Sequence, residues 1–296
     1  MHPFFWKQLD LNRRAYEHWL DRREKQYAFP VEIQAEYDIP YLSDGGDCHR
    51  MDVFYPKQRT GLLPAALNFH GGGLLLCTRH VNRPFCAELA RQGFVVFNVD
   101  YPLLPEKDAC GILRDVCDGI RYAEGLLDRF GADPDRLFLT GDSAGAYLAL
   151  YAAAAQKDPA IAAAAGMTPG RIPVKAMGFV SGMFDTVLCD DPGLFLRGEF
   201  YGADWRSHPM MPYLRPDRPE VASLLPPTIL VTSGFDKLRS ASLRLYRGLQ
   251  QAGIPSRLLD FPPNPRLRHD FVVQFPEKKE GAEAVRAIAE FLHQNV

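Results

Sequence analysis

The chain has 296 residues, with 34 Lys and Arg against 36 Asp and Glu, so its formal charge is −2. Hydrophobic residues make up 47% and charged residues 24% of the sequence, a composition typical of globular proteins that excludes intrinsic disorder. The basic surplus of a nucleic-acid-binding domain is missing, so no nucleic-acid partner is expected. The length fits two domains, or one large α/β domain with an inserted lid.

The six cysteines are scattered, without a CxxC pair or the clustering of a metal site: Cys48, Cys77, Cys86, Cys110, Cys117 and Cys189. We expect free, mostly buried thiols. The first residues lack the basic start, apolar run and cleavage site of a secretory signal. The longest apolar run, at 144–155, is shorter than the about 20 residues that a membrane span needs. The sequence therefore predicts a cytoplasmic protein with no membrane partner.

The chain opens with residues 4–27, where apolar and aromatic side chains recur among charges at the spacing of one or two amphipathic helices. Residues 31–42 and 50–55 then alternate in the manner of strands, and the turn residues at 44–47 separate them. This pattern predicts an antiparallel pair at one edge of a sheet.

Short apolar runs alternate with helical patterns in the rest of the chain. The predicted strands are 65–69, 94–99, 136–140, 174–180, 228–232 and 256–261. The predicted helices are 81–92, 112–130, 144–155, 241–252 and 280–293, and a turn is expected at 133–135. Strands that alternate with helices of ten or more residues imply βαβ units. The predicted fold class is α/β, with a mainly parallel central sheet flanked by helices.

Residues 183–225 break this rhythm, with many Pro, Gly, Met and aromatic residues and weak periodicity. A connection of this length inside a compact domain is usually functional and often forms a lid. With the N-terminal helices it would cover the carboxyl ends of the strands, where open α/β sheets bind ligands. We predict an N-terminal cap segment at 1–45, a catalytic core at 46–182 and 223–296, and a cap insertion at 183–222.

The sequence Gly-Asp-Ser-Ala-Gly at 141–145 follows a predicted strand and opens the next helix. A GxSxG at such a junction forms a nucleophile elbow, a turn so sharp that the residues two before and two after the serine must be very small. Ser143 is therefore the predicted nucleophile, and the N–H of Ala144 is predicted to face an oxyanion. An ordinary glycine-rich turn is the alternative.

The sequence His-Gly-Gly-Gly at 70–73 ends an earlier predicted strand. Three successive glycines suit a backbone that must approach a reacting group closely. We expect the N–H groups of Gly72 and Gly73 to complete the oxyanion hole, with a flexible loop as the alternative. His70 is expected to shape this loop rather than to act as a general base.

A serine nucleophile needs a base, and in this type of sheet the acid and then the histidine follow the serine along the chain. Three histidines do so: His208 in the predicted lid, His269 in the loop after the last strand and His293 in the last helix. A base in the loop after the last strand could reach back over the sheet, so His269 is the predicted base.

The orienting acid should follow a strand end. Asp236 lies just beyond the predicted strand 228–232, where the acid belongs. Asp260, within the last strand, is the main alternative, and Asp270 stands beside the base. We predict Asp236.

Together these motifs resemble the hormone-sensitive-lipase-like esterases of the α/β-hydrolase fold, the branch marked by HGGG and GDSAG. The resemblance runs from about Val53 to the end of the chain. Asp-Tyr-Pro-Leu-Leu-Pro-Glu at 100–106 is similar to the family's DYRLAPE, and Leu-Pro-Pro-Thr at 225–228 is like its LPPT. The resemblance implies that Ser143, Asp236 and His269 are nucleophile, acid and base, and that the N-terminal helices and the insertion form a cap.

The chain also departs from the family pattern. Pro102 and Leu104 replace the Arg and Ala of the family's tyrosine motif, Lys237 replaces the Pro after the acid, and Asp270 follows the base where Gly is common. None of these changes removes a reacting group, so they bear on substrate choice more than on chemistry. Glu106 is retained, and the resemblance implies that it lies near the catalytic serine. The predicted supporting residues are His70, Gly71, Asp142 and Glu106.

The expected reaction is hydrolysis of a small ester with a short, acetyl-type acyl group, through an acyl-enzyme and without metal or cofactor. A carbohydrate or xylan acetyl esterase is the alternative, and a small peptidase or a non-catalytic binding protein of the same fold is less favoured. The sequence allows a homo-oligomer. Five N-terminal aromatic residues are candidates to line the substrate pocket, although packing against the body is their more ordinary role: Phe4, Phe5, Trp6, Tyr16 and Trp19.

Overall fold

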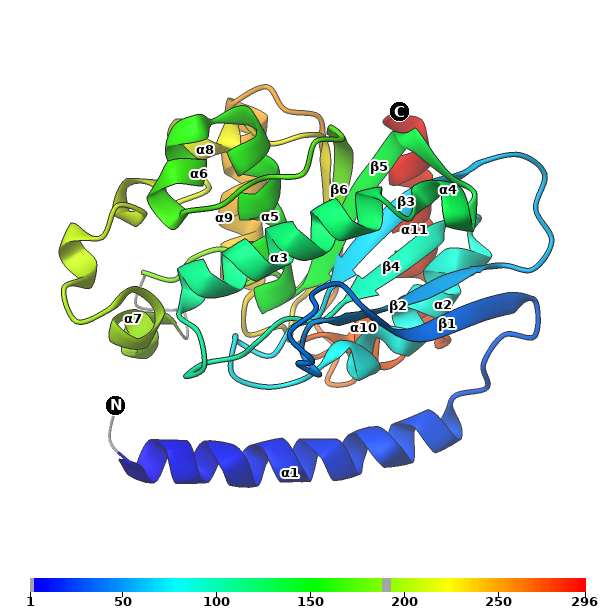
Figure 1. The fold of residues 1–296 in the computed structure, drawn as a ribbon, viewed down its shortest axis with the longest axis horizontal. Helices are drawn as coiled ribbons and strands as arrows, with labels where there is room; N and C mark the ends of the chain where they lie inside the picture. The colour runs from blue at the N-terminus through cyan, green and yellow to red at the C-terminus, as the bar shows by residue number, and fades with distance from the viewer. Residues whose placement is uncertain (1–2, 188–192) are drawn as a thin grey trace.

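An eight-stranded sheet with strand order β1-β2-β4-β3-β5-β6-β7-β8 runs through the molecule (Figure 1). The structure is a computed structural model and describes residues 3–187 and 193–296. The strands are β1 (Ile33–Pro40), β2 (Arg50–Pro56), β3 (Leu63–Phe69), β4 (Val95–Val99), β5 (Ala132–Asp142), β6 (Val174–Val180), β7 (Thr228–Ser233) and β8 (Ser256–Phe261). The pairs β1–β2 and β2–β4 are antiparallel, and every pair from β4 to β8 is parallel. The predicted α/β class, with an antiparallel pair at one edge, is confirmed.

Helices cover both faces of this sheet. The α-helices of the described residues are α1 (Pro3–Gln26), α2 (Arg83–Arg91), α3 (Ala109–Glu124), α4 (Leu127–Phe130), α5 (Ala144–Lys157), α6 (Pro159–Ala165), α7 (Gly193–Tyr201), α8 (Pro219–Ala222), α9 (Arg239–Gln251), α10 (Phe271–Gln274) and α11 (Lys279–Gln294). Short 3-10 helices form η1 (Arg79–Asn82), η2 (Trp205–Ser207) and η3 (Met211–Tyr213).

The core has two layers because successive strand residues face opposite sides of the sheet. In β3, Ala65 and Leu67 pack with the cluster that contains α3 and α5, whereas Ala66 packs with α2 and α11 on the other face (Figure 1). The buried strands are apolar on both faces, as a parallel sheet between two helical layers requires. This packing fixes the positions of the carboxyl ends of β3, β5 and β7 relative to one another.

Two sequence expectations differ from the structure. The predicted helix 112–130 is interrupted at Gly125, where α3 ends, and a separate α4 ends at the left-handed Gly131. The predicted turn 133–135 lies within β5, because Pro64 of β3 pairs with Asp133 and the register shifts beyond it. Local turn residues predicted a break here, and pairing with β3 overrides it.

A single long helix, α1, stands where one or two were predicted, and it runs along the outside of the body (Figure 1). The side chain of Arg13 donates to the carbonyl oxygens of Leu75 and Leu104, at 2.9 and 2.7 Å. Further along α1, Arg23 donates to the carbonyl oxygen of Gln274 at 2.7 Å. These bonds attach α1 to loops at the active-site end of the sheet. No described helix is long and apolar enough to cross a membrane.

The predicted insertion carries α7, η2, η3 and α8, and it packs on the helical layer formed by α3 and α5 (Figure 1). The hydroxyl groups of Tyr147 in α5 and Tyr201 in α7 lie 3.0 Å apart. The hydroxyl of Tyr151 donates to the carbonyl oxygen of Tyr213 at 2.6 Å. Cys189 lies outside the described residues, and the five other cysteines are free thiols.

Candidate active site

Ser143 sits at the turn between β5 and α5 in a backbone conformation that non-glycine residues rarely adopt, with φ 47° and ψ −115°. Two hydrogen bonds hold it there, from the N–H of Ser143 to the carbonyl oxygen of Val180 and from the N–H of Met183 to that of Ser143. A side chain at Gly145 would place its Cβ only 2.0 Å from the carbonyl oxygen of Phe69. The turn therefore has the strain and close backbone approach of a nucleophile elbow.

The structure brings the three predicted catalytic side chains together. Nε2 of His269 lies 3.1 Å from Oγ of Ser143, and its Nδ1 lies 2.8 Å from Oδ1 of Asp236. Asp236 also accepts hydrogen bonds from the backbone N–H of Leu238 and the hydroxyl of Thr232, both at 2.9 Å. Because Nδ1 faces a carboxylate, it carries a proton and leaves Nε2 to serve the serine.

The alternative residues lie elsewhere. Asp260 forms an ion pair with Arg239 at 2.6 Å. His208 accepts a hydrogen bond from the backbone N–H of Met210, and His293 contacts the carbonyl oxygen of Gln92 at 3.1 Å. None of these three side chains touches Ser143, so the geometry favours the predicted assignment.

A second carboxyl group that the sequence reasoning weighed only as a rival acid also touches the base. Oδ2 of Asp270 lies 3.0 Å from Nε2 of His269. Burial alone would lower the pKa of His269, but the charges and hydrogen bonds of Asp270 and Asp236 outweigh it and raise the pKa to about 9. Burial would raise the pKa of Asp236, yet His269 holds it below its usual range. The sequence carried one signal for this contact: Asp270 follows the base where the family pattern has Gly.

The glycine loop lies beside the serine. Gly72 and Gly73 line the same cavity of about 210 Å³ as Ser143. Gly72 has φ 109°, and a Cβ there would lie 2.0 Å from the carbonyl oxygen of Leu76, so the turn admits only glycine. Ala144 is the first residue of α5, where a backbone N–H has no partner inside the helix. Two of the three residues predicted to supply the oxyanion hole thus line the cavity of Ser143, and the third follows Ser143 in the chain.

Asp142 and Gly71 join the loop to the elbow. The carboxyl group of Asp142 accepts hydrogen bonds from the backbone N–H of Gly71 and from Nδ2 of Asn82, the latter at 2.6 Å. Burial, reinforced by the nearby Asp270, raises the pKa of Asp142 well above its usual range. This buried carboxyl group thus links the glycine loop to the elbow, and Asn82 is a supporting residue that the sequence reasoning missed.

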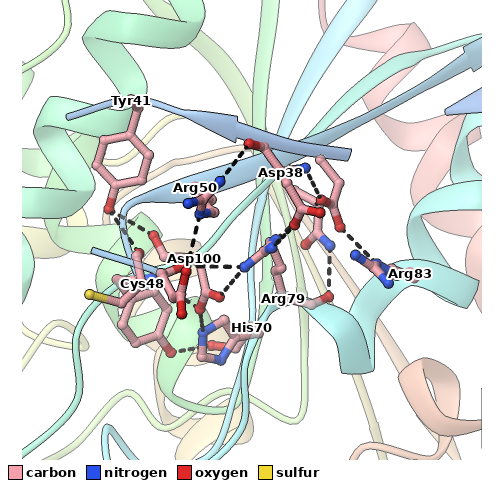
Figure 2. A network of polar contacts seen from close by, with 12 residues as sticks. Asp38, Tyr41, Cys48, Arg50, His70, Arg79, Arg83 and Asp100 are labelled. Atoms are coloured by element: carbon pink, nitrogen blue, oxygen red, sulfur yellow. Dashed lines mark hydrogen bonds and ion pairs between the residues drawn. The ribbon is translucent and has the colours of Figure 1, made fainter. Parts of the chain in front are cut away.

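His70 is fully buried beneath the loop. Its Nδ1 lies 2.8 Å from the carbonyl oxygen of Gly71, and its Nε2 lies 2.8 Å from Oδ1 of Asp100 (Figure 2). The ring stacks on that of Tyr101, with centroids 4.1 Å apart, and the Tyr101 hydroxyl donates to the carbonyl oxygen of His70. Both ring nitrogens are occupied by partners other than Ser143, which favours the expected loop-shaping role.

Figure 2 shows a charged cluster behind His70, centred on the buried side chain of Arg79. The Arg79 guanidinium donates to Asp100 at 2.8 Å, to Asp52 at 3.1 Å and to Asp38. Arg83 donates to the other oxygen of Asp52 at 2.8 Å. The sequence reasoning missed this cluster because its carboxylates come from β1, β2 and the end of β4, and only the folded sheet brings them together.

Two cavities flank Cys77. Tyr16 and Trp19 of α1 line the catalytic cavity, and Met183 is the single member of the predicted insertion among its described lining residues. The side chains of Phe4, Phe5 and Trp6 lie outside what the structure describes. In the described part of the chain, the cavity is therefore covered by α1 more than by the insertion.

The larger cavity, of about 640 Å³, is lined by the Arg79 cluster and lacks Ser143. Glu106, expected near the serine, lines this larger cavity instead. The physical reason is that the N–H of Leu104 bonds to the carbonyl oxygen of Leu74, which ties the segment to the far side of the glycine loop. No group of three or more metal-ligating side chains occurs among the described residues.

Comparison with known proteins identifies the family of the chain. A profile of the α/β-hydrolase fold family matches residues 66–272. The versiconal hemiacetal acetate esterase of Dothistroma septosporum is 26% identical, over 83% of this chain and 86% of that protein. Esterase LipI of Mycobacterium tuberculosis is 26% identical over 65% of this chain, and the match spans 61% of its length. The inhibited esterase B of Lactobacillus rhamnosis has the same fold, with a TM-score of 0.89 at 23% identity, over 98% of this chain and 96% of that one.

A strained serine at a strand–helix turn, with a histidine from the loop after the last strand, is the arrangement of an α/β hydrolase. The profile match extends over more than half of the chain. The chain belongs to the α/β-hydrolase family, as the motifs HGGG and GDSAG predicted.

Proposed function

We propose that this protein hydrolyses carboxylic esters of short acyl groups, with Ser143 as the nucleophile. The observation that carries the proposal is the continuous set of contacts from Ser143 through His269 to Asp236, beside the N–H groups of the glycine loop. The relative from Dothistroma septosporum, which this chain matches over 86% of its length, is named as an acetate esterase. That name supports an ester substrate and an acetyl-type acyl group.

The reaction has two halves. In the first, Ser143 attacks the ester carbonyl while Nε2 of His269 takes the serine proton and then gives it to the leaving alcohol. Asp236 keeps the imidazole in the required tautomer and stabilises its cation. The N–H groups of Gly72, Gly73 and Ala144 stabilise the negative oxygen of the tetrahedral intermediate. In the second half, water replaces the serine oxygen as the attacking group, and the same residues return the enzyme to its initial state.

The size of the cavity supports a short acyl group. The space beside Ser143 amounts to about 210 Å³, and it is bounded by Tyr16, Trp19 and Met183. A long acyl chain would need more room or a displacement of α1. Rates on p-nitrophenyl acetate, butyrate, octanoate and palmitate test this, with the highest rate expected on acetate or butyrate. A maximum at palmitate would contradict the proposal.

The identity of the nucleophile has its own test. The Ser143→Ala variant should lose turnover of p-nitrophenyl acetate and should no longer be labelled by a fluorophosphonate. The Ser223→Ala variant is a control at an exposed serine, whose hydroxyl donates to the carbonyl oxygen of Pro219. Wild-type activity in Ser143→Ala, or labelling that survives it, would rule out Ser143 as the nucleophile.

A further inference from the structure

The carboxyl group of Asp270 has no role in the reaction as described, yet it is held firmly at the reacting centre. The residue has a left-handed backbone, with φ 58°, and its N–H donates to the hydroxyl of Ser181 at 3.2 Å. Oδ2 lies 3.0 Å from Nε2 of His269. Oδ1 is buried without a hydrogen-bond partner in the described part of the chain. The solvent-facing edge of the carboxyl group is therefore the one that carries Oδ2, and Asp270 lines the catalytic cavity.

This position coincides with that of the leaving alcohol. Nε2 of His269 must hand its proton to the leaving oxygen, so that oxygen lies within hydrogen-bond distance of Nε2 during the reaction. Oδ2 of Asp270 is within the same distance of Nε2. A group on the carbon atom next to the ester-bearing carbon of the alcohol can therefore reach Oδ2.

The charges around the cavity select the kind of group. Besides His269, an acidic and a basic side chain face it: Asp270 and Lys237. Burial raises the pKa of Asp270, and the neighbouring His269 opposes that rise. Burial, together with Asp270, raises the pKa of Asp142, the second carboxyl group of the cavity, and so favours its neutral form. The phenol of Tyr16 and the thiol of Cys77 are uncharged as well, because burial raises the pKa of both. The balance of one carboxylate against one ammonium favours neither a cationic nor an anionic alcohol.

The remaining lining is mostly apolar, with Gln274 as a further polar side chain. Tyr16 and Trp19 present rings whose centroids are 5.5 Å apart, on the side of the cavity that α1 covers. A mostly apolar pocket with a few fixed polar groups is typical of a site that orients a neutral ligand. Among these groups, the carboxyl group of Asp270 is the one in contact with Nε2 of His269. The group that fits is a hydroxyl.

We propose that Asp270 selects esters whose alcohol carries a neutral hydroxyl next to the ester-bearing carbon, as in monoesters of glycols, glycerol or sugars. The inference rests on the proposed ester hydrolysis and names its substrate class. The hydroxyl donates to Oδ2 and occupies the carboxylate that otherwise attracts a proton on Nε2. Nε2 is then free to accept the proton of Ser143, so the contact promotes catalysis as well as binding.

A pair of nearly isosteric substrates tests this. 2-Hydroxyethyl acetate and n-propyl acetate differ only by a hydroxyl in place of a methyl group, and acetate release reports on both. After division by the rates of hydroxide-catalysed hydrolysis, the wild type should prefer the hydroxylated ester in kcat/KM about tenfold to hundredfold, as for a hydrogen bond to a charged acceptor. The preference should fall in Asp270→Asn and vanish in Asp270→Gly, both of which tolerate the left-handed backbone.

The controls separate the contact from general effects. The preference is a ratio within each variant, so a changed pKa of His269 affects both substrates alike. Asp260→Asn removes a carboxylate that pairs with Arg239 outside the cavity, and it should keep the wild-type preference. Acetylcholine and 3,3-dimethylbutyl acetate form a second pair that differs in charge. Similar rates on this second pair are expected.

Three outcomes would overturn the inference: equal corrected rates on the first pair in the wild type, a preference that survives in Asp270→Gly, or a strong preference for acetylcholine. The last would mark a cation site instead. Hydrolysis of p-nitrophenyl acetate by the wild type separates these failures from failure of the proposed function, because that ester lacks the hydroxyl and needs only the triad.

Discussion

Asp270 and Ser143 approach the same nitrogen of His269, with Oδ2 of Asp270 3.0 Å and Oγ of Ser143 3.1 Å from Nε2. A protonated Nε2 donates to the carboxylate, whereas a catalytic Nε2 must accept from the serine. The two contacts are therefore alternatives, and the protonation of His269 decides between them. The ability of His269 to act as a base therefore depends on pH and on the carboxyl group of Asp270.

Activity should be highest in alkaline solution. Burial would lower the pKa of His269, but Asp270 and Asp236 raise it to about 9. Below that pH the imidazole is a cation and cannot accept the serine proton, so kcat/KM on p-nitrophenyl acetate should rise with pH and level off above about 9. A profile measured from pH 6 to 10.5 checks this. A plateau already reached at pH 7 would show that Asp270 does not hold a proton on the base.

Removing the charge of Asp270 should move that profile toward acid. In Asp270→Asn the largest influence that raises the pKa of His269 is gone, and the midpoint should fall by about 1 unit or more. The same pH series measures it, with Asp260→Asn as a control that keeps the wild-type midpoint. An unchanged midpoint in Asp270→Asn would contradict the role assigned to the Asp270 carboxylate.

The acid of the triad can be distinguished from its rival by a matched pair of variants. Asp236→Asn leaves the contact with His269 in place but permits the wrong tautomer, so kcat should drop by about 10³–10⁴. Asp260→Asn breaks only the ion pair with Arg239 and should leave kcat within about twofold of the wild type. Steady-state rates on p-nitrophenyl acetate measure both. The opposite order of effects would reassign the acid to Asp260.

The oxyanion loop offers a comparison between adjacent glycines. In Gly72→Ala the new Cβ would lie 2.0 Å from the carbonyl oxygen of Leu76, so the loop must move. Its N–H groups would then no longer point at the oxygen of the tetrahedral intermediate. Gly73 has φ 66°, but a Cβ there would meet no atom within 4 Å beyond its chain neighbours. Gly73→Ala therefore brings only backbone strain of about 1–2 kcal/mol.

We therefore expect Gly72→Ala to lower kcat by about 10²–10³, comparable to the loss of an oxyanion donor, and Gly73→Ala to lower it much less. KM should change little in either variant, because the N–H groups act on the transition state. Equal losses in the two variants would indicate that strain, rather than the close approach at Gly72, governs the loop.

The sequence predicted those parts of the molecule that local chemistry specifies. Ser143 and the glycine loop lie at strand ends marked by their own motifs, and the order of chain elements pointed to Asp236 and His269. Glu106 was placed by resemblance alone, and it lies in the other cavity. The cluster around Arg79 depends on strand pairing over long separations, which no local pattern records.

In the cap, too, local patterns predicted the secondary structure, whereas long-range contacts determine its position. Periodicity predicted helical structure in the first residues, but only the bonds of Arg13 to two distant loops place α1 over the cavity. Asp270 was visible in the sequence as a departure from a family pattern. Its contact with Nε2 of His269 depends on a left-handed backbone that the sequence did not predict.

Arg79 should be the most sensitive charged residue for stability. Its guanidinium neutralises carboxylates that are themselves buried, and Asp52 and Asp100 are 0% and 2% exposed. In Arg79→Met these carboxylates lose their main counter-charge, and a buried ion pair broken on one side is destabilised by about 3–5 kcal/mol. Urea unfolding should report this loss in the free energy of unfolding. Because Asp100 holds Nε2 of His70 at 2.8 Å, kcat should fall as well.

Arg257 provides the matched control. It pairs with Glu290 at 4.0 Å, and the two side chains are 46% and 63% exposed. Exposed ion pairs contribute about 1 kcal/mol or less, so Arg257→Met should leave the free energy of unfolding and kcat near the wild-type values. Arg79→Lys separates charge from geometry, since it restores one cation but not the fork that reaches three carboxylates. Partial recovery of stability without recovery of kcat is expected, because only the guanidinium can bind Asp52 and hold Asp100 against His70 at once. Full recovery of kcat in Arg79→Lys would show that the cluster acts through its charge alone.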